Sequence, residues 1–348
     1  MTSVKRLPVS DPLSKAYLHN AYQLSILGSR EDTKTWIFMN YIQLVSKNGD
    51  YDFPVTFYLP DYEGYNWSIL TPWFDYKVIS REFVVMHDLD FGQLIRNAIS
   101  NDEYVYFYVN ERHIPGTPAE IGNYDYNHMI LVHGYDFQND DVFFFGYDQN
   151  GRFSERFVNV KILKQAYFCN QYTFERFENR VYLIKLRSDA GFKLKLEIGH
   201  IIEQFIDLKD SKRKIGNVLD YHTDFHYTYG LDVYDNVIRN IQLVHDGEFE
   251  DTRTKVVIPL QLIMEHKHIM IERLKFINQY YPSANLQTSI MNYGELKHSF
   301  EGCKNSVLKY EILKNKEILQ TVMRDIEVTK TKEQTIISQL IENLRPLL

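Results

Sequence analysis

The sequence predicts an α+β protein whose first half mixes strands with helices and whose second half is helical. Short apolar runs rich in Val, Ile, Tyr and Phe, which are typical of strands, recur up to residue 186. After residues 188–191, Ser-Asp-Ala-Gly, such runs disappear and apolar residues recur at helical spacing. Because 348 residues exceed the usual size of one domain, we expect two, residues 1–188 and residues 189–348.

The composition argues against several classes of protein. A net charge of −7 disfavours a nucleic-acid binder, which needs a basic face. No apolar run is long enough for a membrane span, and the N-terminus lacks the apolar core of a signal peptide. Two cysteines, Cys169 and Cys303, provide neither a disulfide framework nor a cysteine-based zinc site. These features together predict a cytoplasmic protein.

The first half alternates helices and strands before the central hairpin. Helical spacing predicts helices at residues 16–27, 30–46 and 90–100, the last with Asp88 or Asp90 as its cap. Residues 104–109 form the strongest strand by β propensity, and shorter strands are expected at 55–58 and 83–86. A helix at 161–167 and a strand at 180–186 complete this half.

Residues 127–151 predict a buried β-hairpin. The apolar runs 129–132 and 142–145 flank a polar turn at 138–141. His128 begins the first strand and Asp148 follows the second, so the folded hairpin brings them to one region. An imidazole and a carboxylate can there form the base-and-orienter pair of nucleophilic catalysis. The alternative, which spacing alone favours, is that His128 ends a strand and Asp148 makes a turn with Gly151.

The pattern of His128, four apolar residues and two Gly-Tyr-Asp triplets, at 134–136 and 146–148, resembles the His strand of papain-like folds. More closely, it resembles the N-terminal domain of the butirosin biosynthesis protein H family, over about residues 10–185. The resemblance implies a papain-like first domain from bacterial clusters for aminoglycosides and nonribosomal peptides. It also implies a Cys-His-Asp acyltransferase that moves an acyl group from a carrier-protein thioester to an amine.

The same resemblance implies partners and a nucleophile. The expected partners are an acyl or peptidyl carrier protein, which bears the phosphopantetheine, and a small-molecule amine; no cofactor of the chain's own is implied. The nucleophilic Cys would lie within residues 17–20, at the start of the first helix, where the helix dipole lowers a thiol pKa. This sequence has Tyr17, Leu18, His19 and Asn20 there, and no Cys. We expect His19 and Asn20 at the catalytic position and Tyr17 as a substrate contact, with Ser25 as a weak substitute nucleophile.

The loop at 110–127 precedes the His strand and is expected to lie over the cleft. Glu111, Arg112 and His113 are therefore candidate substrate-binding residues, although residues in such a position are more often ordinary solvated loop residues. A metal site of His113, His128 and His133 is disfavoured, because an odd separation places His128 and His133 on opposite faces of a strand.

The second half predicts a helical bundle. Helices are expected at 192–208, 229–244, 259–281, 289–328 (as one helix or two) and 330–344, with apolar stripes that form a core. The run Glu-His-Lys-His at 265–268 is expected on a solvated face. His222 and His226 have the spacing of a helical metal pair, but they lack an HExxH context. No glycine-rich phosphate loop occurs, so nucleotide chemistry is not indicated.

Two functions remain open. The first is acyl transfer, or the making or cleavage of an amide, in bacterial secondary metabolism, with His128 as general base, Asp148 as its orienter and no thiol. The second is a catalytically degenerate papain-like protein that binds a carrier protein or a peptide without turnover. The absent Cys favours the second and the retained His and Asp favour the first, which we expect. The helical half would either dock the carrier protein or form a homodimer interface.

Overall fold

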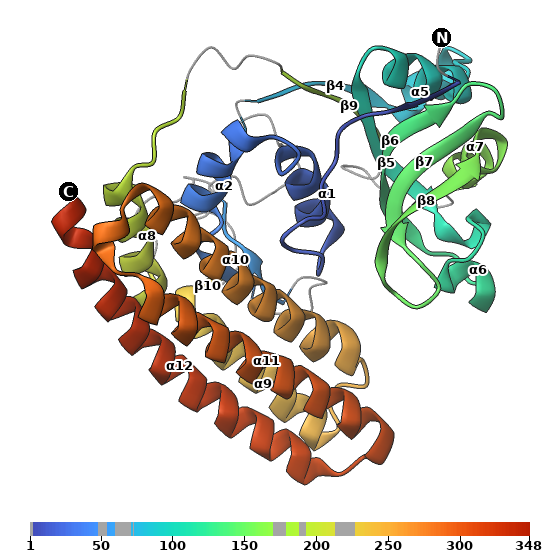
Figure 1. Ribbon diagram of the computed structural model, residues 1–348. Coiled ribbons are helices and arrows are strands. Elements are labelled where there is room, and N and C mark those ends of the chain that lie inside the picture. Colours follow the sequence, from blue (N-terminus) through green and yellow to red (C-terminus); the bar gives the residue numbers. More distant parts are fainter. Residues whose placement is uncertain are drawn as a thin grey trace. The chain divides into compact units, whose positions relative to one another are not determined.

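The computed structural model describes residues 3–47, 54–59, 71, 73–169, 179–187, 193–212 and 227–348. Over these residues the chain is an α+β protein with two compact units (Figure 1). Unit 1 takes in the described residues of 1–12, 18–31 and 65–193, and unit 2 those of 13–17, 32–64 and 194–348. The division therefore differs from a single boundary near residue 188, because residues 13–17 and the described residues of 32–64 fold with the helical half. The expected boundary residues 188–191, and also His222 and His226, lie outside the described residues.

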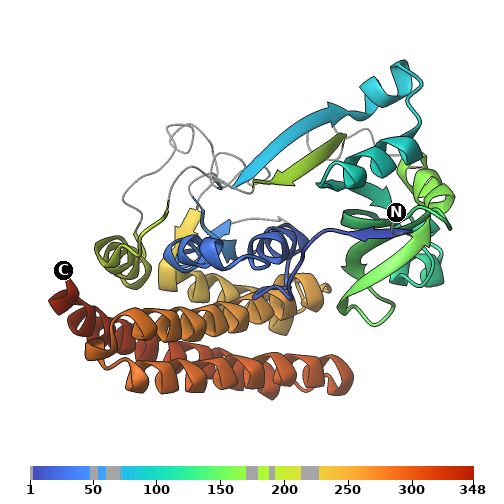
Figure 2. The same ribbon diagram turned by 45° about the horizontal axis from the view of Figure 1, so that its top comes forward.

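Unit 1 is built on an antiparallel sheet with the strand order β4-β9-β5-β6-β7-β8, in which β1 also pairs with β6. Figure 2 shows β4 and β9 extending together as a two-stranded ribbon. The expected central hairpin is confirmed as β6 and β7, which pair antiparallel. The strands are β1 (Val4–Arg6), β4 (Phe74–Ser80), β5 (Glu103–Asn110), β6 (Asn127–Asp136), β7 (Asp141–Tyr147), β8 (Phe153–Asn159) and β9 (Arg180–Leu186).

Helices cover both faces of this sheet. Tyr106 and Phe107 are neighbours on β5, so their rings point to opposite faces. The ring of Tyr22, from α1, lies 5.9 Å from that of Tyr106, whereas the ring of Phe91, from α5, lies 5.0 Å from that of Phe107. Tyr167 of α7 stacks on Phe91 at 3.8 Å and completes the second layer. The helices of unit 1 are α1 (Leu18–Leu27), α4 (Arg81–Met86), α5 (Phe91–Ser100), α6 (Pro118–Gly122) and α7 (Val160–Phe168), with the 3-10 turn η2 (Glu111–His113).

Of two short segments of unit 1 that follow a capping residue, one was predicted correctly as a helix and the other was not. The helix expected at 90–100 is confirmed as α5, and the Asp90 carboxylate accepts hydrogen bonds from the N–H groups of Gly92 and Gln93. The strand expected at 83–86 is wrong, because this segment is helix α4. The Ser80 side chain accepts from the N–H of Phe83 and so caps that helix. A short apolar run has no periodicity that separates the two structures.

Unit 2 combines a helical bundle with a small sheet of order β10-β2-β3. Its strands are β2 (Leu44–Lys47), β3 (Thr56–Phe57) and β10 (Tyr227–Tyr229). Its α-helices are α2 (Lys34–Asn40), α8 (Ile198–Lys209), α9 (Val233–Asp246), α10 (Ile258–Tyr280), α11 (Gln287–Leu313) and α12 (Lys316–Leu344). Its short helical turns are η4 (Gly230–Asp232), η5 (Arg253–Val257), η6 (Pro282–Ala284) and η7 (Arg345–Leu347), and η1 (Glu31–Thr33) spans the junction with unit 1.

The single helix expected at residues 30–46 is wrong. Helix α2 ends at Asn40, and β2 begins four residues later. The buried guanidinium of Arg273, from α10, donates to the carbonyls of Phe38 and Tyr41 at 2.6 and 2.5 Å. These carbonyls belong to the end of α2, where intrahelical partners run out. The partner that ends the helix is thus more than 230 residues away along the chain.

A chain of buried polar side chains runs through the interior of unit 2. The Lys267 ammonium lies 2.6 Å from a carboxylate oxygen of Glu333, and neither side chain is exposed. The Tyr234 hydroxyl donates to the other Glu333 oxygen at 2.7 Å, and Lys267 donates to Nδ1 of His266 at 3.0 Å. Nε2 of His266 then donates to the carbonyl of Ile42 at 2.7 Å. The solvated face expected for residues 265–268 is therefore wrong at Glu265, His266 and Lys267, which are all buried.

This arrangement makes the stability of unit 2 depend on pH through His266. Burial, followed by the Lys267 charge, keeps the pKa of His266 well below its ordinary value, so the folded ring is neutral. The unfolded chain takes up a proton there as the pH falls below about 6.5. The stabilisation is therefore complete above that pH and declines below it, by up to about 1.4 kcal/mol per pH unit. Urea unfolding at pH 7, 6 and 5 should show this decline, with a shallower slope for His266→Gln; equal slopes would contradict it.

Candidate active site

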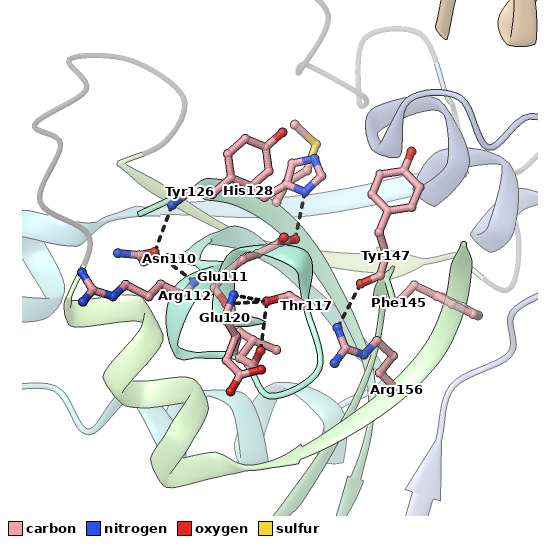
Figure 3. A network of polar contacts seen from close by, with 12 residues as sticks. Asn110, Glu111, Arg112, Thr117, Glu120, Tyr126, His128, Phe145, Tyr147 and Arg156 are labelled. Atoms are coloured by element: carbon pink, nitrogen blue, oxygen red, sulfur yellow. Dashed lines mark hydrogen bonds and ion pairs between the residues drawn. The ribbon is translucent and has the colours of Figure 1, made fainter. Parts of the chain in front are cut away.

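The candidate site lies at the end of the unit 1 sheet where β5 stops and β6 starts. Val109 pairs with His128 and Asn110 with Asn127, and the N–H of Glu111 donates to the carbonyl of Tyr126 at 2.8 Å. The ladder thus continues one residue beyond β5 and brings the Glu111 side chain to His128. Nδ1 of His128 lies 2.9 Å from Oε1 of Glu111 (Figure 3). Glu111 is 6% exposed at its side chain and His128 17%, so this contact is shielded from water but within reach of a ligand.

The Glu111 contact determines which nitrogen of His128 can act as a base. A carboxylate accepts hydrogen bonds, so Nδ1 carries the proton and Nε2 has the lone pair. Among the described residues the imidazole has no second hydrogen-bond partner. The ring of Tyr147, at the end of β7, stacks on His128 at 5.7 Å, and that of Tyr126 lies 5.1 Å away. The site therefore contains an oriented imidazole between two aromatic rings.

The pairing expected between His128 and Asp148 is wrong, because Asp148 closes the turn between β7 and β8. Its carboxylate accepts from the N–H groups of Asn150 and Arg152, at 2.8 and 2.9 Å. These two donors, that of Arg152 first, lower the pKa of Asp148. The carboxylates of Asp148 and Glu111 both lie near the end of the hairpin, and the register between β5 and β6 determines which of them contacts His128. That register shows that Glu111, expected in the loop as a substrate contact, is the partner of His128.

Helix α1 is fastened to the sheet next to His128. The buried hydroxyl of Tyr22 lies 2.8 Å from the carbonyl of Met129 and 3.0 Å from that of Phe145. Burial and then the negative charge of Glu111 raise the pKa of Tyr22 well above its ordinary value, so the hydroxyl keeps its proton and donates. Tyr22 therefore connects the middle of α1 to β6, one residue from His128, and to β7.

The residues at the expected nucleophile position provide no nucleophile. Asn20 is buried in the first turn of α1, and burial lowers the pKa of His19 to about 4. Ser25 is fully buried, which removes it as a substitute nucleophile, and Tyr17 is buried in unit 2. Helix α1 contains no Cys.

The two cysteines of the chain lie elsewhere. Cys169 follows α7, and Cys303 is in α11 of unit 2, where burial raises the pKa of its thiol to about 12. Among the described residues the site thus combines an imidazole, that of His128, with the carboxylate of Glu111, and neither cysteine contributes to this contact.

The polar contacts of Arg112 and His113 are with residues other than His128. Nε of Arg112 donates to the Asn123 side chain at 3.0 Å, and its guanidinium lies 3.4 Å from the Asp125 carboxylate. Nδ1 of His113 lies 3.5 Å from the Gln165 amide of α7. Arg112 therefore holds the loop that leads into β6, and the substrate-binding role expected for both residues stays a prediction.

No family model matches the chain, and no curated protein matches it. The resemblance to the butirosin biosynthesis protein H family, and with it the papain-like fold, therefore stays a prediction. Across the described ranges no group of three or more His, Cys, Asp or Glu side chains is placed to hold a metal ion. In that same part of the chain, each helix is too short or too polar to cross a lipid bilayer.

Proposed function

We propose that unit 1 transfers an acyl group from a carrier-bound thioester to an amine, with His128 as general base and Glu111 as its orienting carboxylate. The observation that carries this proposal is the 2.9 Å contact between Nδ1 of His128 and the buried Glu111 carboxylate. It leaves Nε2 as the proton acceptor and gives the imidazolium a counter-charge when it forms.

The reaction needs one nucleophile, which the acceptor brings. The amine nitrogen attacks the thioester carbonyl carbon, and Nε2 of His128 takes the proton that the nitrogen must lose. The C–N bond forms, the C–S bond breaks, and the departing thiolate receives the proton from the imidazolium. The products are an amide and the free thiol of the carrier's phosphopantetheine, and the base is regenerated.

A thioester is activated enough for direct attack, so the protein's contribution is orientation and proton transfer. A positioned general base typically gives about 10²–10⁴-fold in rate. Holding the amine and the thioester together adds to this, since orientation alone can lower a barrier by several kcal/mol, up to about 7–11 in the best cases. A protein thiol is therefore not essential to the scheme.

A second function is favoured by the first turn of α1. Where a papain-like enzyme would have its thiol, this chain has Leu18, His19 and Asn20, and burial keeps His19 neutral at pH 7. A protein with this turn would bind an acyl-loaded carrier protein or a peptide and release it unchanged.

One experiment separates the two functions. The purified chain is mixed with a phosphopantetheinylated carrier protein that bears an acetyl group, and glycinamide is added as the amine. Mass spectrometry follows amide formation, and calorimetry measures binding of the loaded carrier without the amine. Acyl transfer predicts a rate above that of the same mixture without the protein. Binding with a background rate supports the second function, and neither binding nor turnover would exclude both.

A further inference from the structure

A row of aromatic rings leads from the surface of unit 1 to the candidate base. Tyr124 and Tyr126 are 48% and 46% exposed. Their ring centroids lie 6.4 Å apart, and that of Tyr126 lies 5.1 Å from the imidazole of His128. Tyr147 continues the row on the far side of His128 (Figure 3).

The loop that carries these tyrosines is held by polar contacts of the intervening residues. Asn123 accepts from Arg112, and Asp125 accepts from the amide of Asn110 at 2.8 Å. The side-chain oxygen of Asn110 in turn accepts from the N–H of Tyr126 at 3.2 Å. The loop is thus anchored on alternate residues, while the rings between them stay exposed.

Gly122 provides independent evidence that the position of Tyr124 is built into the fold. A Cβ on Gly122 would lie 2.7 and 2.8 Å from two ring carbons of Tyr124, distances that real Cβ contacts do not reach. The Tyr124 ring therefore lies directly against the main chain of α6, and only glycine leaves room for it. Asn123, with φ of 52°, makes the left-handed turn that brings Tyr124 back onto the helix.

The electrostatics of the row indicate what it can bind. The carboxylate between the two tyrosines in the sequence, Asp125, contacts Asn110 and Arg112, and these contacts lower its pKa. The planes of the two tyrosine rings are 64° apart, so the pair meets edge to face and does not form one flat surface. The 62% exposed Ile121 of α6 lies beside them in the sequence. Such a surface favours a planar, uncharged ring, which stacks on a ring face without needing a partner of opposite charge.

We propose that Tyr124 and Tyr126 form a stacking platform for a planar, uncharged ring on the acyl group whose carbonyl is delivered to His128. The platform rests on the proposed function for the identity of the group at His128. Because the Tyr126 ring itself lies 5.1 Å from the imidazole, a ring that stacks on Tyr126 can present to His128 a carbonyl that is attached directly or through a few bonds. The substrate class is thus an aromatic acyl thioester, in preference to a short aliphatic one.

Binding of two unreactive probes tests the platform without any turnover. The probes are the benzoyl and acetyl analogues of pantetheine in which nitrogen replaces the thioester sulfur. Calorimetry should show tighter binding of the benzoyl analogue to the wild type. Tyr126→Leu and Tyr124→Leu should each weaken it roughly two- to tenfold, the worth of one aromatic contact, and leave the acetyl analogue unchanged.

Two further variants test whether benzoyl binding depends on the aromatic ring itself and on its position. Tyr126→Phe keeps the ring and should keep the benzoyl preference. Gly122→Ala leaves both tyrosines in the sequence but displaces the Tyr124 ring, so it should weaken benzoyl binding as Tyr124→Leu does. A thermal unfolding curve for each variant shows that the protein remains folded.

The outcomes for the platform and for the proposed function are distinguishable. A benzoyl preference that depends on the two rings, in a protein that forms no amide, supports the platform and refutes catalysis. Amide formation with equal affinities for both probes supports catalysis and overturns the platform. The platform is also overturned if the benzoyl analogue does not bind, or if the leucine variants weaken both probes alike.

Discussion

Replacing His128 by alanine is expected to lower the rate of amide formation by roughly 10²–10⁴-fold, the usual worth of a positioned general base. Nε2 is the His128 nitrogen left to accept a proton, because Nδ1 is engaged by the Glu111 carboxylate. The measurement is the initial rate with an acyl-loaded carrier, with binding of that carrier as a check on folding. A His128→Ala variant as active as the wild type would show that the imidazole is not the base.

The two carboxylates near the hairpin provide a matched comparison for the same reaction. Glu111→Gln removes the charge that orients His128 and should lower the rate by at least roughly 10-fold, because a glutamine amide can favour the wrong tautomer. Asp148→Asn changes a carboxylate of the same hairpin that caps a turn, and should leave the rate within a factor of about two. The reverse ranking would restore Asp148 as the orienter.

The sequence located the hairpin and its histidine but not the partner of that histidine. Two apolar runs around a polar turn are a local signal, and β6 and β7 form as this signal predicts. The partner depends on the register between β5 and β6, which are joined by a loop of 16 residues between Asn110 and Asn127. Glu111 is that loop's first residue, and nothing in its neighbours distinguishes it from a solvated glutamate. Strand register is set by long-range pairing, and spacing alone does not reveal it.

Helix boundaries show the same division between local and distant causes. Asp90 is a visible N-cap, and α5 begins directly after it as expected. The expected break between residues 328 and 330 is wrong, because α12 runs without interruption from Lys316 to Leu344. The end of α2, in contrast, is set by Arg273 of α10. The burial of Lys267 likewise depends on Glu333 of α12, 66 residues further along the chain. A charged run in a single sequence is expected on the surface unless its partner is known.

The pair of Lys267 and Glu333 should make the largest single contribution to the stability of unit 2 when one partner is removed. Glu333→Leu leaves the ammonium of Lys267 in the interior without its carboxylate, and Tyr234 loses its acceptor. We expect a loss of about 3–5 kcal/mol in the free energy of unfolding, measured with urea by circular dichroism. Lys330→Ala is the control, since Lys330 pairs with Asp232 and Asp235 at the surface and should cost at most about 1 kcal/mol.

Removing the charges of both Lys267 and Glu333 should restore most of the free energy of unfolding that Glu333→Leu alone loses. In the double variant Lys267→Met/Glu333→Leu no ion is buried without a partner, and the new side chains are unbranched or apolar and close in volume to the old ones. A buried ion pair and a well-packed apolar pair are often of similar stability, because desolvation of the ions offsets their attraction. The coupling between the two sites should therefore be roughly 2 kcal/mol or more, near the upper part of the range for residues in contact. Additive losses would show that the two side chains act separately, and that the 2.6 Å contact contributes little to the fold.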